Sequence, residues 1–202
     1  MWGKCMKWLF ALLLSVGAAC AFAAQEANSR GESSAPTVPS PRPLPQAGEG
    51  DKVSLRDVHV RSFVRGSHQQ IISARAGKPF IISFWSLTCT NCRDDLALFG
   101  KLAQKYRDFD LVIVSTDSPE QNQEIAQTLQ RYRLGRAGLG RIESWVFADS
   151  FAERLRFEVD AQWYGELPRT YFYDAQGHVM ALSGTLDHAQ TENWIRESRK
   201  HG

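Results

Sequence analysis

Residues 80–96 read F-I-I-S-F-W-S-L-T-C-T-N-C-R-D-D-L and decide the fold. The apolar and β-branched run at 80–85 predicts a buried strand, and apolar residues at helical spacing follow from Cys92 to Tyr106. Cys89 and Cys92 fall at the junction, where cysteines three residues apart in the first turn of a helix share one face. A disulfide between them needs no backbone movement. This stretch therefore predicts a dithiol that opens and closes readily.

The start of the predicted helix also supplies chemistry to the cysteines. Unpaired backbone N–H groups and the positive end of the helix dipole favour an anion, so the pKa of the Cys89 thiol should fall below the roughly 8.5 of a free thiol. Cys89 is therefore the candidate nucleophile. Cys92 falls on the core-facing stripe, from which it can attack a mixed disulfide, so it is the candidate resolving thiol.

The first residues of the chain have the pattern of an export signal. Lys4 and Lys7 precede an uncharged run at residues 8–25, and the Ala-Phe-Ala triplet at 21–23 fits a small-x-small cleavage site. We expect a signal peptide at 1–23. Its removal leaves 22 basic residues against 22 acidic ones, and this neutral balance argues against a nucleic-acid partner.

Two other interpretations of this start remain open. The run at 8–25 is about 18 residues long, the lower limit for a membrane-spanning helix, so an uncleaved anchor is possible. Cys20 follows Gly17-Ala18-Ala19, which is a poor match to a lipoprotein cleavage box. We therefore rank a cleaved signal and a periplasmic protein first, a domain anchored in the inner membrane and facing the periplasm second, and lipidation third.

Residues 24–50 differ in composition from the rest of the chain. They are rich in Ser, Gly, Glu and Ala and hold five of the eight prolines, which predicts a disordered Pro-rich linker. A length of 202 residues with 43% hydrophobic content allows one core, so 51–202 should form one domain. Without residues 1–23, Cys89 and Cys92 are the only cysteines. A disulfide between them would close a very short loop and would constrain little of the unfolded chain. This favours a redox role for the two cysteines over a structural one.

The pattern along the rest of the chain predicts alternating strands and helices. Residues 51–73 predict two short strands around a turn at 65–68, covering a sheet edge. Further elements are expected as follows: a strand at 109–115, a helix beginning at 117–120, a strand ending at 145–148, a helix at 150–159, a hairpin of strands at 171–173 and 179–182, and a last helix capped by Asp187. Such an order indicates an α/β layer structure with a central mixed sheet.

With these motifs placed, the sequence resembles the thioredoxin superfamily. The resemblance is carried by Phe84-Trp85 ahead of Cys89, by the C-x-x-C, and by Leu167-Pro168-Arg169-Thr170 before the hairpin. Gly77-Lys78-Pro79 and the export signal are most similar to TlpA-like thiol:disulfide interchange proteins, over about residues 52–200. The resemblance implies a thioredoxin-like fold with an N-terminal strand extension and an insertion between the second and third core strands.

The same resemblance implies roles for residues around the cysteines. It implies a redox-active Cys89–Cys92 disulfide and a cis bond before Pro168, which would pack beside the cysteines. The Leu167 backbone would pair with the substrate segment. Further substrate contacts are expected from three residues: Trp85, Thr90 and Asn91.

Two positions depart from the pattern and bear on proton transfer. Ser83 stands where thioredoxin has a buried Asp that moves protons for the resolving cysteine. Some TlpA-like reductases instead place an acid three residues after the second cysteine, and Asp95 stands there. We hypothesise that Asp95 helps to deprotonate Cys92, with a solvated carboxylate on the helix surface as the equally weighted alternative.

Other classes of protein receive weaker support from the sequence. The histidines show no paired spacing, so we expect no metal and no other cofactor, although a copper-binding or assembly protein of this fold stays open. Thr88, four residues before Cys92, has a peroxiredoxin-like spacing without the expected proline. A non-catalytic binding module is conceivable, but the intact cysteine pair argues against it.

The sequence thus predicts an exported thiol:disulfide oxidoreductase that reduces partner proteins. A disulfide donor of the same fold is the main alternative, because direction depends on the reduction potential. The expected partners are proteins with disulfides or thiols. Because an oxidising compartment offers no reductant, the resemblance also implies a membrane thiol-relay electron donor, with an antioxidant role or apocytochrome c and copper-site proteins as clients.

Overall fold

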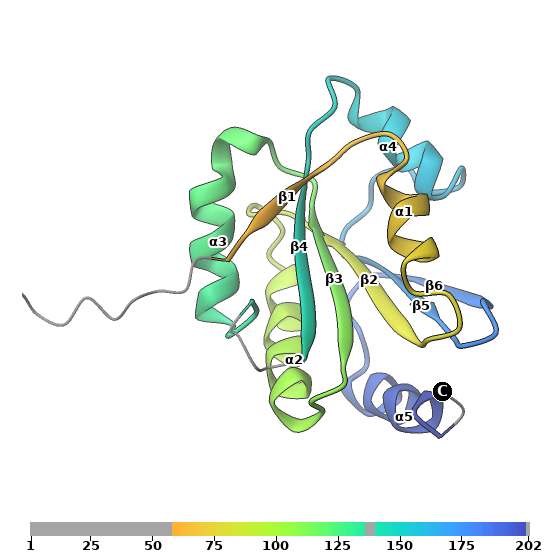
Figure 1. The fold of residues 1–202 in the computed structure, drawn as a ribbon. Coiled ribbons are helices and arrows are strands. Elements are labelled where there is room, and N and C mark those ends of the chain that lie inside the picture. The colour runs from red at the N-terminus through yellow and green to blue at the C-terminus, as the bar shows by residue number, and fades with distance from the viewer. Residues whose placement is uncertain (1–57, 136–139, 201–202) are drawn as a thin grey trace, which may run out of the picture. The chain divides into compact units, whose positions relative to one another are not determined.

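A six-stranded sheet in the order β1-β4-β3-β2-β5-β6 organises the domain (Figure 1). The computed structural model describes residues 58–135 and 140–200, so the predicted signal at 1–23 and linker at 24–50 lie outside the described residues. The strands are β1 (Val60–Phe63), β2 (Phe80–Trp85), β3 (Asp110–Ser115), β4 (Arg141–Phe147), β5 (Arg169–Tyr173) and β6 (Val179–Ser183). The helices are α1 (Ser67–Ser73), α2 (Cys92–Lys105), the 3₁₀ turn η1 (Pro119–Gln121), α3 (Asn122–Arg131), α4 (Ala152–Val159) and α5 (His188–Ser198).

The sheet is mixed, as predicted, and its strand directions create one functional edge. Strands β1, β4, β3 and β2 pair in parallel, whereas β5 pairs antiparallel with both β2 and β6. The carboxyl ends of β2, β3 and β4 therefore meet at the same edge. Since Arg169 pairs with Phe84, the beginning of β5 lies at this edge as well.

Two apolar layers hold helices on opposite faces of the sheet. Helices α2, α3 and α5 pack against the face that carries Ile81, Leu111 and Ile113. Helices α1 and α4 cover the other face (Figure 1). Phe80, Ile82, Phe84 and the alternate β3 residues Val112 and Val114 belong to the apolar cluster on this face. All six residues of β2 are buried, as are all six of β3, because a strand covered on both faces has no solvent side. The predicted α/β fold with a mixed sheet between helices is thus confirmed.

One predicted element at the beginning of the domain is wrong. Residues 67–73 form helix α1 instead of the second of two short strands. Gly66, at φ 83°, turns the chain into this helix. The helix buries Ile71 in the core, while Ile72 stays only partly buried. A half-buried strand would show the same difference in burial between two adjacent residues. The adjacent Ile71-Ile72 pair therefore could not distinguish the two states.

The remaining elements follow the predicted order. Strand β1 is an edge strand paired with β4, which fits the expected N-terminal extension. The segment between β3 and β5 contributes strand β4. The sequence indicated only the end of this strand, at 145–148, whereas the strand begins at Arg141. The Asp187 carboxylate caps α5 by accepting the Gln190 N–H at 2.8 Å, as predicted. Among the described residues, none of the helices combines the length and apolar character needed to cross a membrane.

Candidate active site

The two cysteines are joined in a disulfide between β2 and α2. Strand β2 ends at Trp85, and helix α2 begins at Cys92, so the loop between them carries Cys89. The two Cα atoms are 5.4 Å apart, within the range of separations that a disulfide usually spans. Cys89 is partly exposed, whereas Cys92 is 1% exposed within the core cluster. A partner can therefore reach the Cys89 sulfur far more easily than the Cys92 sulfur.

A backbone N–H group at the helix start faces the outer sulfur. The Cys92 N–H donates to Cys89 Sγ at 3.2 Å. This N–H belongs to the first turn of α2, where the helix supplies no carbonyl partner and the dipole is positive. When the disulfide is reduced, the same arrangement stabilises a Cys89 thiolate. The Cys92 N–H is therefore one specific group through which the helix start would lower the pKa of the Cys89 thiol.

The cis-proline loop lies at the same edge of the sheet. The Leu167–Pro168 peptide bond is cis, which confirms the expectation drawn from the resemblance. Because Arg169 pairs with Phe84, Pro168 lies beside the end of β2, where the cysteine loop begins. Leu167 is half-buried and packs against both core clusters, one of which holds the cysteines. The loop is fixed from the other side by the Gly184 N–H, which donates to the Pro168 carbonyl at 2.9 Å.

Asp95 is buried, so the alternative of a solvated surface carboxylate is wrong. Its side chain is 1% exposed, and Oδ1 accepts the Leu186 N–H at 2.9 Å. Burial raises the pKa of Asp95 to about 6; the charge of Asp94 adds to this, while the Leu186 N–H and His188 oppose it. Its Oδ2 atom has no hydrogen-bond partner among the described residues. Residues three apart on a helix are neighbours, so this carboxyl group lies one turn from Cys92.

Ser83 does not replace the missing acid in the middle of the sheet. Its hydroxyl is buried and forms a hydrogen bond of 3.0 Å with the Thr170 hydroxyl, so both polar groups are satisfied. A hydroxyl pair of this kind does not titrate near neutral pH. On the buried face of helix α2, the carboxyl group one turn from Cys92 is therefore that of Asp95.

The predicted substrate contacts differ in how accessible they are. Thr90 and Asn91 are exposed on the loop between the cysteines. Trp85 is 2% exposed and packs in the same core cluster as Cys92, so its side chain supports the disulfide from the interior. Its backbone carbonyl accepts the Thr116 N–H at 2.9 Å, which ties the end of β2 to the end of β3.

Asp117 is a residue of the site whose role the sequence did not reveal. Its Oδ2 accepts the Leu87 N–H at 2.8 Å and the Ser115 hydroxyl at 2.5 Å. The carboxylate therefore holds the loop that carries Cys89 against the end of β3. The sequence indicated Asp117 only as part of a helix start, although its position after a buried strand was a usable signal.

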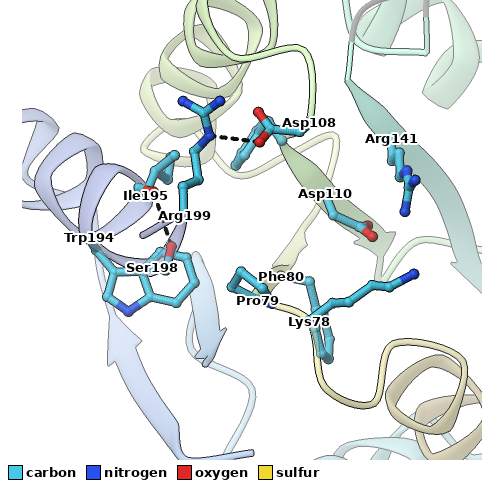
Figure 2. Close-up of a pocket in the computed structure, with 11 residues that line it drawn as sticks. Lys78, Pro79, Phe80, Asp108, Asp110, Arg141, Trp194, Ile195, Ser198 and Arg199 are labelled. Atoms are coloured by element: carbon cyan, nitrogen blue, oxygen red, sulfur yellow. Dashed lines mark hydrogen bonds and ion pairs between the residues drawn. The ribbon is translucent and has the colours of Figure 1, made fainter. Parts of the chain in front are cut away.

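A pocket of about 320 Å³ lies at the opposite end of the sheet (Figure 2). Phe80 and Asp110, which line it, are the first residues of β2 and β3, whereas the disulfide follows the end of β2. Lys78 and Arg141 extend toward Asp110, and Arg199 pairs with Asp108 at 2.7 Å (Figure 2). This pocket is therefore separate from the cysteines. Within the described part of the chain, no group of three or more His, Cys, Asp or Glu side chains is arranged to hold a metal ion.

Residues 55–182, more than half of the chain, match the AhpC/TSA family. The chain belongs to this family. Similar solved structures include a secreted Mycobacterium tuberculosis disulfide oxidoreductase homologous to E. coli DsbE, at 15% identity and a TM-score of 0.47, covering 62% of this chain and 85% of that one. Another is a thiol:disulfide interchange protein of the thioredoxin family from Chlorobium tepidum, at 20% identity and a TM-score of 0.47, covering 63% and 83%. No curated protein matches the chain.

Membership of the AhpC/TSA family confirms the predicted thioredoxin-like fold. Together with the disulfide at the strand-to-helix junction, it makes the chain a thioredoxin-like thiol:disulfide oxidoreductase.

Proposed function

We propose that this AhpC/TSA-family enzyme is exported and reduces disulfides in partner proteins, with Cys89 as the attacking thiol and Cys92 as the resolving thiol. The observation that carries this proposal is the unequal burial of one bonded pair. Cys89 is partly exposed, while Cys92 is 1% exposed in the core cluster against which Leu167 of the cis-proline loop packs. Only the outer sulfur is placed to meet a macromolecular disulfide.

The reaction transfers two electrons from the enzyme to its client. In the reduced enzyme the Cys89 thiolate attacks one sulfur of the client disulfide, so that bond breaks and a mixed disulfide forms. The released client sulfur leaves as a thiolate and takes a proton from solvent. The Cys92 thiol then loses its proton and attacks Cys89 Sγ. The mixed disulfide breaks, the Cys89–Cys92 bond forms, and the client departs as a dithiol.

Asp95 is the proposed acceptor for the Cys92 proton. A carboxyl group with a pKa of about 6 is mostly ionised at neutral pH, yet it is a stronger base than an ordinary aspartate. Its Oδ1 is occupied by the Leu186 N–H, which leaves Oδ2 for the proton. The resolving step in an Asp95→Asn variant should therefore be slower and should lose its dependence on pH near 6. An unchanged pH profile of client release would remove this role.

Export explains why the enzyme would need a second partner. The expected signal at 1–23 would deliver the domain to an oxidising compartment, in which the Cys89–Cys92 pair must be reduced again after each turnover. A membrane thiol relay is the proposed source of electrons, and apocytochrome c or copper-site proteins are the proposed clients. Cell fractionation with the N-terminal mass of the purified chain tests export and cleavage.

The test of the proposed function uses insulin as the disulfide-bearing protein and two serine variants. The wild-type enzyme should reduce insulin with a dithiol as electron source, and Cys89→Ser should abolish this reduction. Cys92→Ser should instead accumulate a mixed disulfide through Cys89, because the resolving thiol is missing. The reduction potential decides the direction: a value near −270 mV fits a reductant, and one near −120 mV a disulfide donor. Equal trapping by both variants would contradict the assigned roles.

A further inference from the structure

One guanidinium group braces the segment that leads to cis-Pro168. The Arg169 side chain is 13% exposed and directs all of its nitrogens into the protein. Nη2 donates to Asp160 Oδ2 at 2.7 Å, and Nη1 donates to the Ser183 hydroxyl at 2.6 Å. Nε donates to the Tyr171 hydroxyl at 3.0 Å. Arg169, which directly follows Pro168, is thus tied to the end of helix α4 through Asp160 and to strand β6 through Ser183.

The other end of the same segment is tied to the same group of side chains. Glu166 Oε1 lies 3.8 Å from Arg169 Nη1 and accepts the Ser183 hydroxyl at 2.9 Å. Its Oε2 accepts the Tyr164 N–H at 3.2 Å, and its carbonyl accepts the Trp163 indole N–H at 3.0 Å. Both ends of the segment at 160–166 therefore depend on the position of one guanidinium.

This braced segment, whose end at cis-Pro168 lies beside the end of β2, presents a large side chain to solvent. Tyr164 is 88% exposed, although its neighbour Trp163 is buried against Phe84 with ring centroids 4.6 Å apart. Exposed tyrosines are frequent anchors at protein interfaces because they add contact area at a small cost in side-chain entropy. A fixed backbone at Tyr164 would lower the ordering cost of docking a client polypeptide.

We infer that Arg169 is a positioning residue that holds the segment at 160–168 in the shape that docks a client polypeptide beside Cys89, with Tyr164 as a contact. The inference rests on the proposed function, since it concerns the same reaction. Arg169 takes no part in sulfur chemistry. Without it, Asp160 and Glu166 lose their shared counter-ion, and the Ser183 hydroxyl oxygen loses the N–H group that donates to it. The segment then samples other conformations.

The test separates docking from chemistry. Arg169→Met keeps the length and apolar stem of the side chain but removes every donor, and Arg169→Lys restores one charged donor. Arg199→Met is the matched control, because Arg199 pairs with Asp108 at the far end of the sheet. For insulin reduction we expect KM to rise about tenfold in Arg169→Met with kcat nearly unchanged, since small misplacements of docking groups weaken productive binding strongly. Arg169→Lys should recover part of this loss, and the control should match the wild type.

Two further readouts exclude a merely structural effect. In Arg169→Met, a small dithiol should reduce the enzyme's own disulfide at a rate within twofold of the wild type. The reduction potential of that disulfide should be unchanged. If Arg169→Met does not fold, Tyr164→Ala and Ser183→Ala carry the test with a smaller rise in KM, about threefold. An unchanged KM in folded variants overturns the inference, as does an equal loss with the small dithiol. A wild-type enzyme that reduces no protein disulfide overturns the proposed function and this inference together.

Discussion

The buried carboxyl group of Asp95 should make folding stability fall as pH rises. Burial raises the pKa of Asp95 from 3.8 to about 6, so the folded protein holds a proton in a range where the unfolded chain has released it. Since a tenfold change in proton affinity is worth about 1.4 kcal/mol, the ionised group costs about 3 kcal/mol once the pH exceeds the folded pKa. This contribution to the free energy of unfolding is fully present below about pH 4 and is lost as pH rises through about 6.

The variant that isolates this effect is Asp95→Asn. Its amide oxygen can still accept the Leu186 N–H, while its amide N–H₂ replaces Oδ2 at a cost that does not depend on pH. We expect the free energy of unfolding of Asp95→Asn, relative to the wild type, to rise by about 2 kcal/mol between about pH 4 and about pH 7.5. Urea unfolding of both proteins with the disulfide intact measures this difference, because the oxidised cysteines do not titrate.

The control is the adjacent exposed carboxylate of Asp94. Asp94→Asn removes a charge from the same turn of α2 and should keep most of the wild-type decline with pH. A relative stability of Asp95→Asn that stays constant from about pH 4 to about pH 7.5 would refute the reasoning, because Asp95 would then titrate alike in the folded and unfolded chain.

Three further substitutions test the packing that positions the site. Gly100→Ala should destabilise the domain by about 1–3 kcal/mol in urea unfolding, because a Cβ at Gly100 would meet the Tyr132 carbonyl at 2.0 Å; a loss below about 0.5 kcal/mol would contradict this close approach. Arg75→Met should cost about 3–5 kcal/mol, since it leaves the buried Asp110 carboxylate, now 2.9 Å from Arg75, without its partner; unchanged stability would show that Asp110 is neutral or hydrated. Asp187→Ala should lower stability by about 1 kcal/mol through loss of the α5 cap, and an intact thermal midpoint would show that the cap contributes little.

The sequence predicted the centre of the fold well because local patterns determine it. The change from a buried strand to helical spacing located Cys89 and Cys92, and the structure joins them there. Caps and turns at Asp187 and residues 174–177 also depend on neighbouring residues only. Helix α1 was mistaken for a strand because two adjacent isoleucines carry no period.

The features that the sequence missed depend on residues far apart in the chain. The burial of Asp95 requires the Leu186 N–H, 91 residues away, and helical spacing alone left a buried and a solvated carboxylate equally possible. The bracing role of Arg169 arises where α4, β5 and β6 converge, with Asp160 and Ser183 as partners. Contacts of this kind become visible only when the strands are paired.

The most direct measurement of the central claim is a single-turnover reaction between the fully reduced enzyme and excess insulin. We expect each enzyme molecule to remove one insulin disulfide and to lose the mass of two hydrogens as Cys89 and Cys92 become bonded. Cys89→Ser should show neither change. Insulin reduction at the wild-type rate by Cys89→Ser, or a wild-type enzyme that remains reduced in the presence of insulin, would contradict the account.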